Sequence, residues 1–142
     1  MTSKMSKKKF NANFDVLDDI REFVAEIARK AGFSDKEIYS IQLAADEASS
    51  NIIEHAYADV DNGKIEIECV FHKGELKIVM RDQGKSFNPS NVLVPNVKAD
   101  LSERKIGGLG MYLMRKLMDE VSYESLNKKG NVLTMKKRKG ES

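Results

Sequence analysis

The sequence contains little of what stabilises secreted proteins or anchors membrane proteins. Its 142 residues include a single cysteine, Cys69, so no disulfide can form within the chain. A lone cysteine in an alternating apolar run is typical of a buried core residue in a reducing compartment. No window approaches the ~20 apolar residues that a membrane span needs, and the N-terminus has no apolar signal core. The composition therefore predicts a cytoplasmic protein with no membrane partner.

The formal net charge is only +2, from 24 Lys and Arg against 22 Asp and Glu. Tryptophan is absent, and the basic clusters at residues 7–9 and 136–139 have no aromatic residues between their charges. Proteins that bind single-stranded nucleic acid combine basic charge with aromatic side chains on which the bases stack. We therefore expect no direct contact with nucleic acid. The length and the 41% apolar fraction suit one domain. We predict a frayed N-terminus at residues 1–8 and a single domain at residues 9–138.

One amphipathic stretch, residues 34–57, is predicted to form a long helix. Ser34 and Glu37 have the spacing of a capping box, which marks where the helix begins. Apolar residues then recur at helical intervals and form a stripe that must be buried: Ile38, Ile41, Ala45, Ala48, Ile52 and Ala56. A second stripe is polar: Glu47, Asn51 and His55. A carboxylate and a carboxamide one turn apart could serve a magnesium–phosphate site, or they could be solvated positions on a surface helix.

The other periodic segments predict an α+β fold. A first helical pattern is opened by Asp15 as a possible cap and closed by Gly32, and a third continues from Met111. Alternating residues predict hairpins at 64–80 and 120–137. Because hairpins dominate, we expect a two-layer sandwich with a mostly antiparallel mixed sheet and three helices on one face. The segment 88–105 has two prolines and no clear period, which is typical of a lid or binding loop.

Two glycine-containing motifs flank this predicted lid. Asp82-Gln83-Gly84 follows a strand, and the run from Gly107 to Gly110 leads into the third helix. A glycine-rich turn at a helix N-terminus presents converging N–H groups and a favourable dipole to an anion. Each motif alone could be an ordinary turn. The specific feature is their order after a helix that carries Glu47 and Asn51.

This ordered set resembles the GHKL ATPases, the superfamily of gyrase, heat-shock chaperone, histidine kinase and mismatch-repair nucleotide-binding domains. Within it, the likeness is to the anti-sigma-factor serine/threonine kinases. Residues 46–57 (DEASSNIIEHAY) resemble the N-box, residues 82–89 (DQGKSFNP) the first glycine box and residues 107–121 (GGLGMYLMRKLMDEV) the second. The resemblance extends from about residue 10 to residue 137 and implies the Bergerat ATP-binding fold.

The resemblance also implies ATP and Mg²⁺ as cofactors and a role for each motif residue. Asn51 would be a magnesium ligand, and Glu47 would be the general base. Asp82 would accept a hydrogen bond from the adenine amino group, and Gly84 would let the base approach the backbone. The residues expected to bind or neutralise the phosphates are Arg104, Lys105, Gly107, Gly108, Leu109 and Gly110.

Three positions limit what can be carried over from the family. Ile106 stands where many members of the superfamily have another glycine. Asn131 and Val132 stand where some relatives have a threonine pair after the last hairpin glycine, so we predict no adenine contact there. His55 could pack within the helix bundle or take part in catalysis.

The resemblance implies a serine/threonine protein kinase that binds a sigma factor and phosphorylates a small antagonist protein. A 142-residue chain occupied by one domain leaves no room for a phospho-accepting helix hairpin or a transducer domain, so other branches of the superfamily fit less well. Members commonly form homodimers, and the region of Met111, Tyr112 and Met114 or a sheet edge could supply the interface. The alternative is a nucleotide-gated binding protein with little or no phosphotransfer. Glu47 favours the enzyme, because a carboxylate near the γ-phosphate would only repel the nucleotide in a pure binder.

Overall fold

The computed structural model describes residues 4–58, 62–85, 106–126 and 130–140, with backbone alone for residues 4 and 106–111. Its elements, in chain order, are β1 (Lys4–Asn11), the 3₁₀ turn η1 (Phe14–Val16), α1 (Leu17–Ala31), α2 (Asp35–Asn51), the π-helical turn η2 (Ile52–Ala56), β2 (Lys64–His72), β3 (Glu75–Asp82), α3 (Ile106–Leu117), β4 (Glu120–Ser125) and β5 (Asn131–Arg138). None of the helices in these ranges is long and apolar enough to cross a membrane.

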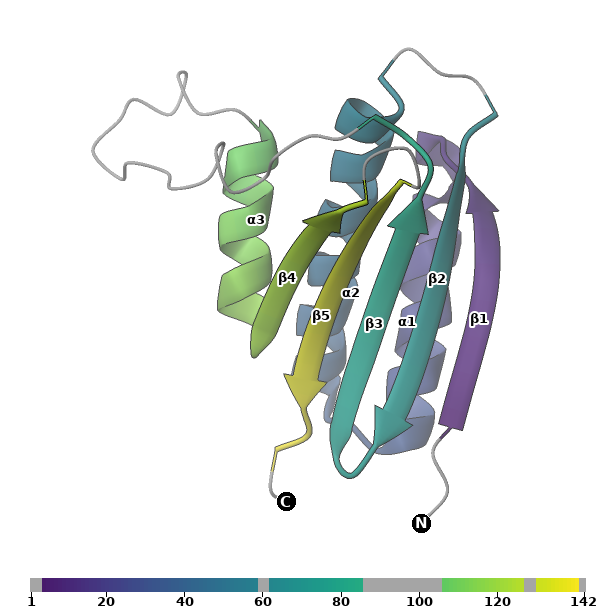
Figure 1. Ribbon diagram of the computed structural model, residues 1–142. Coiled ribbons are helices and arrows are strands. Elements are labelled where there is room, and N and C mark those ends of the chain that lie inside the picture. The colour runs from purple at the N-terminus through teal and green to yellow at the C-terminus, as the bar shows by residue number, and fades with distance from the viewer. Residues whose placement is uncertain (1–3, 59–61, 86–105, 127–129, 141–142) are drawn as a thin grey trace, which may run out of the picture.

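The five strands form one sheet in the order β1-β2-β3-β5-β4. The helices lie together on one face of this sheet, with α2 between α1 and α3 (Figure 1). This arrangement confirms the predicted α+β, two-layer fold. Every neighbouring pair among the described strands is antiparallel. The predicted mixed sheet would have included some parallel pairing, and these strands have none.

The core lies between the helices and alternate residues of the central strands. Ile67 of β2 stands opposite Met80 of β3, and Ile78 of β3 stands opposite Met135 of β5. All four side chains are fully buried, as is Cys69. Burial raises the pKa of the Cys69 thiol to about 12, so this cysteine has the inert environment expected of a core residue.

The N-terminal prediction is wrong for residues 4–8. These residues belong to β1 and pair with β2, with Lys8 opposite Ile67. The polar side chains concealed the strand, because backbone hydrogen bonds to the edge of β2 hold it while Lys7, Lys8 and Lys9 remain exposed. Lysine on an edge strand is a common way to prevent pairing with another chain.

The predicted ends of α1 have opposite outcomes. Gly32 ends the helix with φ of +91°, as predicted. Asp15 is not the cap at the other end, because the side chain of Asn13 accepts a hydrogen bond from the Asp15 N–H and η1 then leads into the helix. The polar residue two positions earlier therefore starts this segment.

The helix α2 begins at the predicted capping box. The Glu37 N–H donates to Ser34 Oγ at 3.1 Å, and the Ser34 N–H donates to Glu37 Oε1 at 2.8 Å. The helix does not stay α-helical to residue 57. At Ile52 the backbone widens into η2, where the Tyr57 N–H donates to Ile52 O at 3.1 Å.

The third helix begins earlier than predicted. The spacing indicated a glycine turn before a helix, whereas α3 begins at Ile106 and takes the glycines at 107, 108 and 110 into its first turns. Glycine costs about 1 kcal/mol in a helix relative to alanine but does not prevent one. The backbone N–H groups of a first helical turn have no partners within the helix, so they can still face an anion.

We expect Ser34→Ala to lower the free energy of unfolding by about 1 kcal/mol, because α2 would lose the acceptor that caps it. Urea unfolding followed by circular dichroism measures this. Ser40→Ala, within the same helix, is the matched control and should change stability by less than about 0.5 kcal/mol. Equal effects of the two substitutions would contradict a capping role for Ser34.

Candidate nucleotide-binding site

Four chain segments meet at one end of the molecule. The C-terminal ends of α2 and β3 lie at the end where α3 and β5 begin (Figure 1). Two hydrogen bonds join three of them: Asn131 Nδ2 donates to Asp82 Oδ1 across β5 and β3, and the Lys85 N–H donates to Ala56 O at the end of η2. The fold therefore brings Asn51, Asp82, Gly84 and the backbone of residues 107–110 to the same end, as the motif order predicted.

The carboxylate of Asp82 is buried, with 2% of the residue exposed. Its Oδ1 atom accepts hydrogen bonds from Asn131 Nδ2 at 2.8 Å and from the Gly84 N–H at 2.9 Å. Its Oδ2 atom is also buried and has no hydrogen-bond partner among the described residues. Two donors thus hold one oxygen of the carboxylate in place, and the other oxygen has no donor in the described ranges.

Burial raises the pKa of the Asp82 carboxyl, and the hydrogen bonds from Asn131 and Gly84 offset this only in part. Folding therefore holds a carboxylate where its charged form is disfavoured. Because the folded-state pKa lies above the unfolded-state value, this group's contribution to stability is fully present below the unfolded pKa. That contribution is lost as the pH rises through the folded pKa.

Asn131 is a site residue that the sequence did not identify. Its amide donates to Asp82 Oδ1 and lies 3.3 Å from the carbonyl oxygens of Gly84 and Lys85. A signal existed in the alternation of β5, because Asn131 is in phase with the core residues Leu133 and Met135. A buried polar residue in a core phase needs a polar partner, which a search for adenine contacts alone did not consider.

Gly84 and Gly130 are required by close approaches of the backbone. A Cβ on Gly84 would lie 2.4 Å from Ala56 O, and a Cβ on Gly130, whose φ is +94°, would lie 2.0 Å from Asp82 O. Glycine at 84 was predicted because the adenine base would approach the backbone. Its contact with the end of η2 is a second reason, independent of any ligand.

The amide oxygen of Asn51, the residue predicted to bind magnesium, is buried. The residue is 3% exposed, and its Oδ1 has no hydrogen-bond partner among the described residues. A buried amide oxygen without a donor is costly, and a hard cation could use it. The described residues contain no cluster of three or more His, Cys, Asp or Glu that could hold a metal unaided. Magnesium would therefore need oxygens from another source, as a bound triphosphate supplies.

Glu47 lies one turn before Asn51 and is half-buried. Desolvation raises the pKa of its carboxyl, and the nearby charges of Asp46 and Glu54 add to the effect. Arg21 of α1 pairs with Asp46, with Nη1 at 2.5 Å from Oδ1, and so ties α1 to the helix beside this group. A carboxylate with a raised pKa is the better proton acceptor near neutral pH.

The remaining predicted residues have less structural support. Arg104, Lys105 and the lid at 88–105 lie outside the described residues. The positions 107–110 are described by backbone alone. The Nε2 atom of His55 lies 4.0 Å from Glu54 Oε2, which gives the imidazole a charged neighbour on its own helix and leaves its role open.

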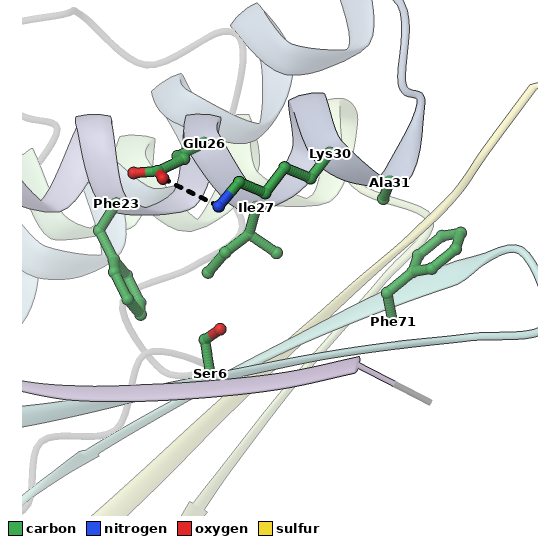
Figure 2. Close-up of a pocket in the computed structure, with 7 residues that line it drawn as sticks. All are labelled: Ser6, Phe23, Glu26, Ile27, Lys30, Ala31 and Phe71. Atoms are coloured by element: carbon green, nitrogen blue, oxygen red, sulfur yellow. Dashed lines mark ion pairs between the residues drawn. The ribbon is translucent and has the colours of Figure 1, made fainter. Parts of the chain in front are cut away.

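A separate pocket of about 180 Å³ lies between α1 and the strands β1 and β2 (Figure 2). Phe23, Ile27 and Phe71 supply most of its apolar lining, and an ion pair of 3.1 Å between Glu26 and Lys30 stands at its rim. None of the predicted ATP-site residues lines it, and none of the buried unpaired polar atoms of the described residues belongs to it. This pocket is therefore separate from the predicted nucleotide site.

The model of the histidine kinase-like ATPase domain family matches residues 10–137 of the chain. The chain belongs to this family. This chain is 34% identical to serine-protein kinase RsbW of Listeria monocytogenes over 99 aligned residues. The alignment covers 67% of this chain and 63% of that relative. The chain is 32% identical over 124 residues to serine-protein kinase RsbW of Bacillus velezensis, which is 82% of this chain and 76% of that relative. The resemblance found in the three sequence motifs is thus confirmed, and the chain spans less than two thirds of the Listeria relative.

A solved structure of the RsbU and RsbW domains of Rv1364c from Mycobacterium tuberculosis has the same fold. The similarity has a TM-score of 0.70 at 18% identity and covers 98% of this histidine kinase-like ATPase chain and 33% of that chain. At this identity the likeness supports the fold and carries no residue roles.

We expect Asp82→Asn to raise the free energy of unfolding of the ligand-free protein at neutral pH, by on the order of 1 kcal/mol. The amide keeps an oxygen for Asn131 and Gly84 and removes the disfavoured buried charge. Urea unfolding at neutral and at mildly acidic pH measures the difference, which should shrink in acid as the carboxyl of the parent becomes protonated.

Asp15→Asn is the matched control for this prediction. Asp15 is exposed, so the same change there should leave stability within about 0.5 kcal/mol at both pH values. A less stable Asp82→Asn protein at neutral pH would show that the charge of Asp82 is stabilised by groups that we have not identified.

Proposed function

We propose that this ATPase-family chain is an ATP-dependent serine/threonine protein kinase that acts as an anti-sigma regulatory factor. It would transfer the γ-phosphoryl group of ATP to a small antagonist protein and would bind a sigma factor, which places its action in the cytoplasm. The observation that supports this most directly is a pair of buried oxygens at one end of the fold, Asn51 Oδ1 and Asp82 Oδ2, which have no hydrogen-bond partner in the part of the chain that the structure describes. A protein with no ligand there would leave two buried acceptors unsatisfied, at a cost of about 1–3 kcal/mol each.

Each of these oxygens suits a different part of Mg²⁺–ATP. Asn51 Oδ1 would be a hard ligand for Mg²⁺, which when bound neutralises phosphate charge. Asp82 Oδ2 would accept a hydrogen bond from the adenine amino group, while a guanine carbonyl at the same place would oppose the carboxylate. Asn131 would keep Asp82 oriented through the other carboxylate oxygen. The first turns of α3 would offer backbone N–H groups to the phosphates.

Glu47 would accept the proton of the serine or threonine hydroxyl of the substrate protein. As that oxygen forms its bond to the γ-phosphorus, the bond from the γ-phosphorus to the bridging oxygen breaks and ADP leaves. The proton moves to the Glu47 carboxylate, and water later removes it. The desolvation that raises the pKa of Glu47 makes it a stronger base than an exposed glutamate.

The partners are proposed from the resemblance and from the two relatives, which are serine-protein kinases. A phosphate added to the antagonist would disrupt a docking surface by its charge and bulk, and the kinase would then be free to hold its sigma factor. A homodimer is also proposed. Of the apolar region suggested for its interface, Met114 is buried in the core and Tyr112 is exposed, while Met111 is described by its backbone alone. Met114 therefore cannot supply a dimer contact in this conformation.

We expect Glu47→Ala to retain ATP affinity and lose phosphoryl transfer by a factor of about 100 or more, because it removes the proton acceptor and no nucleotide contact. The measurement is transfer of labelled phosphate from ATP to a candidate antagonist, together with the Kd for ATP. Asp82→Asn should do the opposite and weaken ATP binding first. Glu22→Ala on α1, an exposed position, is the control that should change neither.

Equal losses of ATP binding in Glu47→Ala and Asp82→Asn would contradict this division of roles. If the wild-type protein binds ATP but transfers no phosphate to the antagonist, the kinase assignment is wrong. The nucleotide-gated binding protein would then be the correct alternative.

The rate of transfer should fall on the acid side with a pKa above the ordinary value of glutamate, because Glu47 must be deprotonated to act and its pKa is raised. The profile of kcat/KM for the antagonist against pH measures this limb. Asp46→Asn removes a nearby negative charge that raises the Glu47 pKa, so it should move the inflection to lower pH. A limb that is unmoved by this substitution would exclude Glu47 as the group responsible.

A further inference from the structure

The hydroxyl of Tyr57 joins two segments at the nucleotide end of the fold. It donates a hydrogen bond to Lys64 O at 2.7 Å, where β2 begins, and accepts one from the Gln83 N–H at 2.7 Å, directly after Asp82. The residue is 6% exposed, and its ring packs where a Cβ on Gly63 would come within 2.6 Å of it. Glycine at 63 therefore leaves the space that the ring occupies.

The π-helical turn η2 places Tyr57 and its neighbour against the same segment. Ala56 O accepts a hydrogen bond from the Lys85 N–H at 2.8 Å. The preceding residue, Gly84, packs so closely against Ala56 that a Cβ there would lie 2.4 Å from Ala56 O. Two consecutive residues at the end of the helix thus bind residues 83 and 85. The helix that carries Asn51 is therefore tied to the backbone that follows Asp82.

The orientation of the Asp82 carboxylate depends on this backbone. Its Oδ1 is held by the Gly84 N–H, one residue beyond the amide that Tyr57 binds, and by Asn131 from β5. If the backbone at Gln83 moved, the Gly84 donor would move with it, and Oδ2 would turn away from its present direction. The Asp82 charge also contributes to the raised pKa of Tyr57, whose main cause is burial, so the two groups are electrostatic neighbours.

We propose that Tyr57 is a positioning residue for adenine: its hydroxyl fixes the main chain at Gln83 so that the Asp82 carboxylate selects ATP over GTP. This inference rests on the proposed ATP site and concerns only its adenine side. The phosphate side is built from Asn51 and the start of α3, to which the Tyr57 hydroxyl makes no hydrogen bond among the described residues.

The test is Tyr57→Phe, which removes the hydroxyl and keeps the ring. Binding of Mg²⁺–ATP, Mg²⁺–GTP and Mg²⁺–tripolyphosphate is measured by calorimetry, and tripolyphosphate reports the phosphate side without a base. We expect the Kd for ATP to rise about tenfold, which corresponds to about 1.4 kcal/mol. The Kd for tripolyphosphate should change by less than about twofold, so the preference for ATP over GTP should fall.

Tyr39→Phe is the matched control, because Tyr39 lies on α2 with 62% of its surface exposed and should alter none of these constants. A second measurement is amide hydrogen exchange of the ligand-free proteins. Exchange at Gln83 and Gly84 should be faster in Tyr57→Phe and unchanged in Tyr39→Phe.

Unchanged ATP affinity in Tyr57→Phe would overturn the inference. So would an equal loss of ATP and tripolyphosphate binding, which would mean that the hydroxyl only stabilises the fold. Unchanged exchange at Gln83 and Gly84 would also overturn it. All of these measurements are of binding or exchange, so they remain decisive if the wild-type protein binds ATP and transfers no phosphate, a result that contradicts the kinase alone.

Discussion

The hydrogen bond between Asp82 and Asn131 is the constraint on which the nucleotide end depends. It crosses from β3 to β5 and holds one carboxylate oxygen, while the other oxygen is buried without a partner among the described residues. Burying a carboxylate in this way disfavours its charge. The fold tolerates the cost because the strands around it are held by a core of Ile67, Ile78, Met80 and Met135. Stability supplied by the core thus maintains a buried carboxylate that is itself unfavourable and that we propose binds adenine.

The helix α2 carries both core residues and candidate site residues. Its capping box fixes the residue at which it begins, and this fixes which side chains face the sheet and which face the site. Ile41 and Ala48 are buried against the sheet, while Glu47 and Asn51 follow on an adjacent stripe. At Ile52 the change to a π-helical turn alters the direction of the last residues, so that Ala56 and Tyr57 reach the backbone after Asp82. Single π-helical turns are frequent at functional sites.

Much of this architecture was predictable because its signals are local. Alternation identified the hairpins, Gly32 ended α1, and Ser34 with Glu37 began α2. The errors did not share one cause. Lys4 to Lys8 form a strand because β2 offers an edge with which to pair, and the glycines of the second glycine box enter α3 although glycine is a poor helix former.

The sequence alone was enough to assign the family and most element types and to single out Glu47, Asn51 and Asp82 as candidate site residues, since these depend on motifs and on spacings of two to four residues. The three-dimensional fold sets the contact of Asn131 with Asp82, because the two are 49 positions apart and meet through the register of β3 with β5. It likewise decided that Gly84 is pressed against Ala56 and that Tyr57 binds Gln83. Such contacts are set by how a helix end meets a strand end, and no periodicity along the chain encodes that meeting.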